Sequence, residues 1–341
     1  MLHKIDEKIL FNEGDNGIHT YRIPTLICTS NNVVLAFAEA RHNSQGDAGQ
    51  IDTVFRKSID GGKSFGPIRT LRANGKDTLG NPALIYDSEI NRVILLHCFN
   101  YGDLGEHVIR TTGAKRDIYC MYSDDEGDTW SEPVNITSSI KHPNWRWYAT
   151  GPNHGVQMKS GRLIMTCNHS EEDFLDNTLS GPTQSHIIYS DDHGMTWKVG
   201  AICVSLTNEC CGVMLPDNQL MVNMRTYDRG NYRCVFISSD EGQSIDLFYE
   251  DKNLVCPVCQ ASIINFQDKL VFSNPESVER KNMTVKVSSD FGRSWEEKLV
   301  LYESHSAYSD LTINTDGKIL CLYENGDDRP YARISLATIE F

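Results

Sequence analysis

The sequence predicts an all-β fold, a six-bladed β-propeller, and three observations carry this prediction. A turn motif of the form Ser-x-Asp-x-Gly-x-(Ser/Thr)-aromatic occurs five times, at intervals of about 50 to 65 residues, which indicates a repeated supersecondary unit. Short apolar or alternating runs dominate the chain, and no window keeps an apolar period of 3.6 residues. Six of these runs share one form, a turn rich in Asn, Asp or Gly followed by an apolar strand. We expect each of the six to be the centre of one blade.

The strands themselves can be placed along the chain in order. The six central strands are predicted at residues 33–41, 93–99, 162–169, 219–225, 269–274 and 318–325. Nearly continuous apolar runs are typical of strands that are covered on both faces. A further strand follows each of the first five and leads into the turn motif, as at residues 52–58, 117–123 and 283–289. The last strand (332–341) and the N-terminal segment 8–12 are expected to complete one blade together, which would close the ring and remove an open edge.

The five copies of the turn motif have a structural explanation. They lie at residues 58–65, 123–130, 190–197, 238–245 and 288–295. Asp and Ser side chains can accept hydrogen bonds from nearby backbone N–H groups, and Gly supplies the position with positive φ. The final Trp would pack its ring between strands. Two copies depart from this residue, since the first ends in Phe65 and the fourth in Ile245. A catalytic acid is needed once and not five times, so we do not assign these aspartates a catalytic or calcium-binding role.

Composition narrows the classes of function. The 341 residues show no linker or low-complexity segment, so we expect one domain covering 1–341. The net charge of −14 argues against a nucleic-acid partner. The chain contains no run of 18 apolar residues, so we expect no insertion into a membrane. The charged start lacks the apolar core of a signal peptide, and eleven cysteines favour a reducing compartment. We therefore expect a cytoplasmic protein, or a secreted one if a leader preceded this sequence. The CxxC spacing of Cys256 and Cys259 is a weak indication of zinc, and we predict no metal.

A set of polar residues is hard to explain as scaffold. In a propeller, polar residues at the ends of central strands point into one mouth of the channel. Several arginines at that mouth would make it locally positive in an otherwise acidic chain, which would suit an anionic ligand. The set consists of Arg22, Arg41, Asp47, Glu209, Arg225, Arg280, Tyr308 and Glu324. Each residue alone could be an ordinary surface or core residue, so the argument depends on the set.

Short motifs around these residues resemble those of one enzyme family. Tyr21-Arg22-Ile23-Pro24 resembles the Arg-Ile-Pro motif of sialidases (neuraminidases), and the five turns resemble their Asp boxes. The resemblance extends over essentially the whole chain. Further matching segments are at residues 38–41, 150–155, 208–210, 223–225 and 307–311. Asp boxes alone are moderately specific because other propellers carry them, but the combination is highly specific.

The resemblance implies an arginine triad that binds the carboxylate of sialic acid. Arg22, Arg225 and Arg280 match its three members, and Glu324 matches the acid that pairs with the first. A guanidinium offers paired donors that fit a carboxylate, and such bonds are stronger than those between neutral groups. Arg293 is the rival of Arg280, but it lies within a turn motif and should face outward.

The resemblance also implies the catalytic residues. Tyr308 matches the nucleophile, and Glu209 matches the base that takes its proton. A neutral phenol avoids the repulsion that a carboxylate nucleophile would meet at an anomeric carbon bearing a carboxylate, and sialidases are a recognised exception to the use of two carboxylates. Asp47 matches the acid/base, with Asp52 as the second choice. Arg41 is expected to line the same pocket.

The function implied is that of an exo-α-sialidase acting on sialylated glycans or glycoconjugates by a retaining mechanism without any cofactor. A trans-sialidase would use the same residues. A non-catalytic sialoglycan-binding propeller would be favoured by loss of the nucleophile or acid, and a structural or protein-binding propeller would leave the arginines unexplained. The pocket for the N-acetyl group should be apolar, and its candidates are Trp145, Trp147 and Tyr148.

Overall fold

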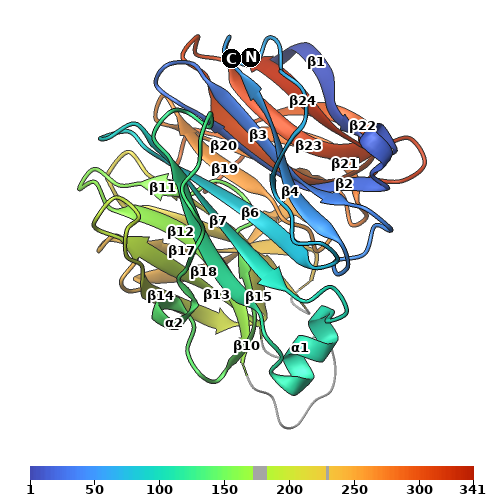
Figure 1. Ribbon diagram of the computed structural model, residues 1–341. Coiled ribbons are helices and arrows are strands. Elements are labelled where there is room, and N and C mark those ends of the chain that lie inside the picture. The colour runs from blue at the N-terminus through green and yellow to red at the C-terminus, as the bar shows by residue number, and fades with distance from the viewer. Residues whose placement is uncertain (172–182, 228–229) are drawn as a thin grey trace.

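The structure, a computed structural model, describes residues 1–171, 183–227 and 230–341, and its regular secondary structure is almost entirely β-strand (Figure 1). Its strands form four sheets, in which neighbouring strands are antiparallel except for one parallel contact between Ile51 and Thr78. This all-β class agrees with the prediction. None of the helices in the described ranges is long and apolar enough to span a membrane.

The first sheet has eight strands and holds the first two predicted central strands. Its order is β2-β3-β4-β6-β7-β8-β9, with β5 paired to β4. The strands are β2 (Thr20–Cys28), β3 (Val34–Arg41), β4 (Ile51–Ser58), β5 (Arg69–Arg72), β6 (Thr78–Asp87), β7 (Arg92–Asn100), β8 (Asp117–Ser123) and β9 (Val134–Asn135).

The second and third sheets each hold one predicted central strand. The second comprises β10 (Trp145–Thr150), β11 (Val156–Gln157), β12 (Leu163–Glu171), β13 (Thr183–Ser190) and β14 (Lys198–Ser205). The third comprises β15 (Thr207–Met214), β16 (Leu220–Thr226), β17 (Tyr232–Ser238) and β18 (Leu247–Val255).

The fourth sheet joins the two ends of the chain. Its order is β1-β24-β23-β22-β21-β20-β19. The strands are β19 (Ser262–Phe266), β20 (Lys269–Pro275), β21 (Lys281–Ser288), β22 (Glu297–Ile313), β23 (Ile319–Gly326), β24 (Arg333–Glu340) and β1 (His3–Asn12). The pairing of β1 with β24 confirms that the N-terminal segment and the last strand complete one unit, and the two termini lie side by side in Figure 1.

The six strands predicted as central occur as β3, β7, β12, β16, β20 and β23, with ends shifted by one or two residues at most. Short helices were not predicted: α1 (Glu106–Thr112), α2 (Thr137–Ile140) and the 3₁₀ turn η1 (Asp15–Gly17). They are too short to show a helical apolar period in the sequence. Large apolar clusters pack between the sheets, and one of them joins Leu26 and Ala36 of the first sheet to Leu322 and Leu336 of the fourth.

The turn motifs adopt one hydrogen-bond pattern, which confirms their structural interpretation. In the second copy, Gly127 N donates to Ser123 Oγ at 2.7 Å, and the backbone N–H and hydroxyl of Thr129 donate to Asp125 at 2.8 and 2.6 Å. These bonds, from Thr129 first, lower the pKa of Asp125 to about 2. The other four copies repeat the pattern, and Gly127 has a φ of 86°. All eleven cysteines are free, and ten are buried.

Candidate active site

One cavity of about 310 Å³ collects seven of the eight predicted site residues. They are Arg22, Arg41, Asp47, Glu209, Arg225, Arg280 and Tyr308. These residues come from the first, third and fourth sheets and from loops beside them. The chain therefore brings together groups that are far apart in the sequence, and most of them are charged.

Arg22 enters the cavity at an irregularity in β2. The register between β2 and β3 shifts between Arg22 and Thr25, and Ile23 has a φ of 58°. A β-branched residue in this left-handed region is a genuine outlier, and such strain persists only where the surroundings enforce it. Here Glu324 accepts a hydrogen bond from Ile23 N at 2.9 Å and thereby holds the strained peptide.

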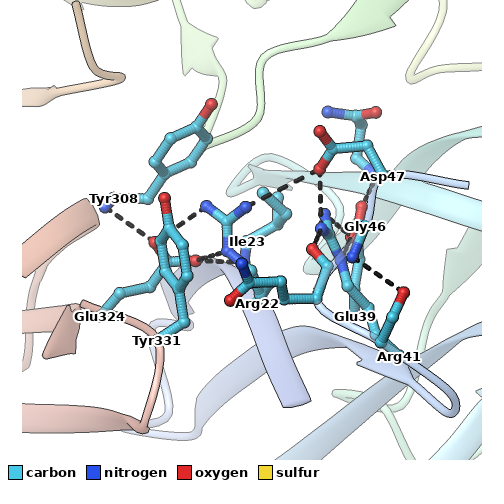
Figure 2. Close-up of polar contacts among 12 residues, drawn as sticks. Arg22, Ile23, Glu39, Arg41, Gly46, Asp47, Tyr308, Glu324 and Tyr331 are labelled. Atoms are coloured by element: carbon cyan, nitrogen blue, oxygen red, sulfur yellow. Dashed lines mark hydrogen bonds and ion pairs between the residues drawn. The ribbon is translucent and has the colours of Figure 1, made fainter. Parts of the chain in front are cut away.

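Glu324 is the anchor of this corner of the site. It accepts two parallel bonds from Arg22, at 3.0 Å from Nε and 3.1 Å from Nη2, and a third from Tyr308 N at 3.1 Å (Figure 2). The carboxylate is fully buried and does not line the cavity. The predicted pairing of Glu324 with Arg22 is confirmed. All the acceptor capacity of this carboxylate is directed to Arg22 and to two backbone groups, so it braces Arg22 from behind the cavity.

Arg225 lies near the end of β16 beside Glu209 of β15. The pairing of Cys210 with Met224 places these two residues next to each other on adjacent strands. Arg225 Nη1 lies 2.5 Å from Glu209 Oε2, and Nη2 donates to the phenol of Tyr227 at 2.7 Å. In the described part of the chain, Arg225 Nε has no hydrogen-bond partner although it is buried. This guanidinium is held in place by its two terminal nitrogens, while its Nε has no partner among the described residues.

Arg280 lies in a bend just before β21 and differs from the other two arginines in its partners. Its Nη1 donates to the phenol oxygen of Tyr331 at 2.6 Å, and its Nη2 donates to the carbonyl of Val258 at 3.3 Å. Within the described ranges, no carboxylate lies within 4.0 Å of Arg280. Arg293, its rival in the sequence, is exposed and does not line the cavity.

Tyr308 lies among the three arginines and contacts a carboxylate. Its hydroxyl donates to Glu209 Oε1 at 2.6 Å and accepts from Arg225 Nη1 at 3.1 Å. The guanidinium carbons of Arg22 and Arg280 lie 5.2 and 5.6 Å from its ring centroid. Burial, and then the charge of Glu209, raise the pKa of Tyr308 well above its usual value. The phenol therefore keeps its proton at neutral pH and shares it with a nearby base.

Asp47 projects from the loop between β3 and β4 toward the cavity (Figure 2). Its Oδ1 lies 2.7 Å from Arg41 Nη1 and 3.7 Å from Arg22 Nη1, and its side chain remains 76% exposed. Partial desolvation acts to raise the pKa of Asp47, but Arg41 and Arg22 outweigh it and lower the pKa. Asp52, the second choice in the sequence, is buried, contacts His42 at 2.7 Å and does not line the cavity.

The rest of the cavity lining is more polar than expected for an N-acetyl pocket. Of the three aromatic candidates only Trp147 lines the cavity, with the guanidinium of Arg116 stacked 3.6 Å from the ring centroid. Trp145 and Tyr148 are packed in the core instead. Glu106 of α1 also lines the cavity, and burial raises its pKa.

Several lining residues were missed in the sequence. Glu39 holds Arg41 through Nε at 2.8 Å, and Tyr227 and Tyr331 hold Arg225 and Arg280. Glu39 lies two residues before Arg41 on the same strand, so its spacing could have suggested a partner. Nothing comparable marks Tyr331, which lies in a turn before β24.

Comparisons with known proteins identify relatives of this chain. Residues 34–321 match the family described as BNR repeat-like domain. A sialidase of Bacteroides fragilis is 31% identical over 92% of this chain and 61% of its own length. A sialidase of Micromonospora viridifaciens is 29% identical over 97% of this chain and 54% of its own length. The chain thus spans little more than half the length of these two relatives.

A solved structure gives the same result for the three-dimensional fold. The Hadza microbial sialidase Hz136 superposes with a TM-score of 0.85 at 27% identity, over 97% of this chain and 68% of that one. The similarity confirms a fold of the β-propeller type.

Proposed function

Since this chain belongs to the sialidase family with the BNR repeat-like domain, we propose that it is an exo-α-sialidase that hydrolyses terminal α-linked sialic acid from glycans or glycoconjugates. One observation carries the proposal: three guanidinium groups surround a cavity in which a phenol donates a 2.6 Å hydrogen bond to a carboxylate. Scaffold residues would have no need of such a concentration of cations.

The arginines bind the carboxylate of the sugar. Arg22, Arg225 and Arg280 each offer N–H groups to the same cavity, and a charge-assisted hydrogen bond contributes roughly 1.5–3 kcal/mol. Binding the carboxylate fixes the anomeric carbon relative to Tyr308, because the carboxylate is attached directly to that carbon. The cavity then accepts one sugar end, which favours an exo-acting enzyme.

Tyr308 is the nucleophile in the first step. Its phenol oxygen attacks the anomeric carbon while its proton passes to Glu209 Oε1, which already accepts a hydrogen bond from it. The raised pKa of Tyr308 means that the free phenolate is not the resting form, so a base must act during the attack. The bond from carbon to the leaving oxygen breaks as the bond to Tyr308 forms.

Asp47 gives its proton to the leaving oxygen in this first step. In the second step it takes a proton from a water that attacks the anomeric carbon, the bond from that carbon to Tyr308 breaks, and Glu209 returns its proton to the phenolate, so sialic acid is released with retention. Arg41 and Arg22 lower the pKa of Asp47 in the unliganded site, which opposes the acid role. A bound substrate carboxylate neutralises part of the charge of Arg22, and the pKa of Asp47 then rises toward the value that an acid needs. Activity should therefore be highest at acidic pH.

The finer architecture belongs to the same proposal: one domain of six blades closed into a ring. The first and fourth sheets each contain two predicted central strands and divide into two blades, and the 17-residue β22 runs through both blades of the fourth. The second and third sheets supply one blade each. The apolar cluster shared by the first and fourth sheets and the β1–β24 pair support closure between the ends of the chain.

Hydrolysis of 4-methylumbelliferyl N-acetyl-α-neuraminide, followed by proton NMR, tests the proposal. We expect release of the fluorophore with α-sialic acid as the first product and a rate that declines as the pH rises above the acidic range. An anhydro sugar or a transfer product would identify a trans-sialidase with the same site. Binding of sialyllactose without turnover would identify a lectin and contradict the proposed activity.

A further inference from the structure

The three arginines of the cavity differ in how their charge is compensated. Arg22 has Glu324 and Arg225 has Glu209, each within hydrogen-bond distance. Arg280 has no carboxylate within 4.0 Å in the described ranges, and its side-chain partner is the phenol of Tyr331. The positive charge that remains uncompensated in the triad is therefore located on Arg280.

Tyr331 contacts two of the three arginines at once. Its hydroxyl accepts a 2.6 Å hydrogen bond from Arg280 Nη1, and the guanidinium carbon of Arg22 lies 3.9 Å from its ring centroid. Figure 2 shows the ring of Tyr331 beside the Arg22 guanidinium and near Glu324. A phenol at this place thus orients Arg280 with its oxygen and Arg22 with its face.

The chemical nature of this partner matters. A carboxylate next to Arg280 would hold it equally well, but it would also neutralise the charge that an incoming carboxylate has to meet. A phenol offers an acceptor without a formal charge, so the guanidinium is oriented and its charge remains available. The carbonyl of Val258, the second partner of Arg280, is also uncharged.

We propose that Tyr331 is a positioning residue that orients Arg280 and Arg22 for a substrate carboxylate and keeps the charge of Arg280 uncompensated. The proposal rests on the sialidase function proposed above and deepens it. It assigns to Tyr331 a role in binding the anionic ligand and no contact with the reacting atoms.

Three variants separate orientation from charge. Tyr331→Phe removes the acceptor for Arg280 and keeps the ring beside Arg22, whereas Tyr331→Leu removes both contacts. Tyr331→Glu restores an acceptor but adds a negative charge. The matched control is Tyr86→Phe, which removes a phenol bonded to Asn91 at 2.6 Å outside the cavity.

The measurements are KM and kcat on 4-methylumbelliferyl N-acetyl-α-neuraminide and the inhibition constant of 2-deoxy-2,3-didehydro-N-acetylneuraminic acid. For Tyr331→Phe we expect KM and the inhibition constant to rise about tenfold, as for a lost hydrogen bond to a charged group, with kcat changed less than about threefold. Tyr331→Leu should lose more, and Tyr331→Glu should be the weakest binder, by about 100-fold. Tyr86→Phe should behave as the wild type.

Two results would overturn the inference while leaving the sialidase function intact. The first is a Tyr331→Phe variant with KM and inhibition constant within twofold of the wild type. The second is a Tyr331→Glu variant that binds as well as or better than Tyr331→Phe, because then any acceptor would serve and neutrality would not matter. A wild-type protein that neither hydrolyses nor binds these sialosides would instead reject the proposed function, and the role of Tyr331 with it.

Discussion

Tyr308 and Asp310 lie two residues apart on β22, but among the described residues the charged groups around Asp310 are fully paired, whereas those around Tyr308 are not. The carboxylate of Asp310 is completely buried. It accepts hydrogen bonds from groups on several separate segments: Thr25 Oγ1 at 3.0 Å, Leu26 N at 2.8 Å, Ser262 Oγ at 2.8 Å and His154 Nδ1 at 2.7 Å. This single side chain thus links the first, second and fourth sheets or the loops beside them.

The cluster around Tyr308 is less completely satisfied. Arg225 Nε lacks a partner in the described part of the chain, Arg280 has only neutral partners, and Asp47 is shared between Arg41 and Arg22 while largely exposed. The comparison teaches that full compensation marks a cluster that stabilises the fold. Incomplete compensation, with the side chains still fixed, marks a cluster prepared for a ligand.

The largest expected effect is on catalysis at the incompletely compensated cluster. Tyr308→Phe removes the attacking oxygen and its hydrogen bond to Glu209, so kcat should fall by at least about 10³-fold. The melting temperature should change little because the ring and its packing remain. Stopped assays on an aryl sialoside, with calorimetry of the same sample, check both points. Near-normal turnover would show that another group is the nucleophile.

The second effect is on stability at the fully compensated cluster. Asp310→Asn removes the charge that faces His154, and breaking a buried ion pair costs roughly 3–5 kcal/mol. Asp125→Asn in an exposed turn motif is the matched control and should cost less. Chemical denaturation measures both. A loss for Asp310→Asn no larger than that of the control would contradict the role of this cluster.

The same variant carries a pH dependence. Burial acts to lower the pKa of His154, but Asp310 outweighs it and raises the pKa well above its ordinary value. The stability from this pair is therefore fully present below a pH of about 6.5, the unfolded value, and is lost as the pH rises through the folded value. The difference in unfolding free energy between wild type and Asp310→Asn should accordingly be larger at acidic than at alkaline pH.

The smallest effect is a shift in a pH profile. Arg41→Gln removes the nearest cation from Asp47, 2.7 Å away, so the pKa of Asp47 should rise. Because the acid must be protonated, the alkaline limb of kcat/KM should move to higher pH. Arg162→Gln, which loses an ion pair to Asp191 on an outer turn, is the control and should leave the profile unchanged. A profile for Arg41→Gln that coincides with the control would exclude Asp47 as the titrating acid.

Site residues that stand in short sequence motifs could be predicted, whereas those without a motif could not. Arg22, Arg225 and Tyr308 stand in short motifs within strands, and the structure places all three in one cavity. Glu324 was recognised as the partner of Arg22, but its depth behind the cavity was not, because burial depends on what packs over it. Tyr331 has no motif at all and became visible only through its contacts with Arg280 and Arg22.

By itself, the sequence determined the six apolar strands and the five turns, because apolar periodicity and the hydrogen bonds of a tight turn act between residues only a few positions apart. Tertiary structure decided which arginines of the triad have an acidic partner and which one has a neutral partner. Arg22 and Glu324 are 302 positions apart, and Tyr308 and Glu209 are 99 apart. Contacts at such separations exist only after the sheets have packed together, so no local pattern in the chain encodes these two pairings.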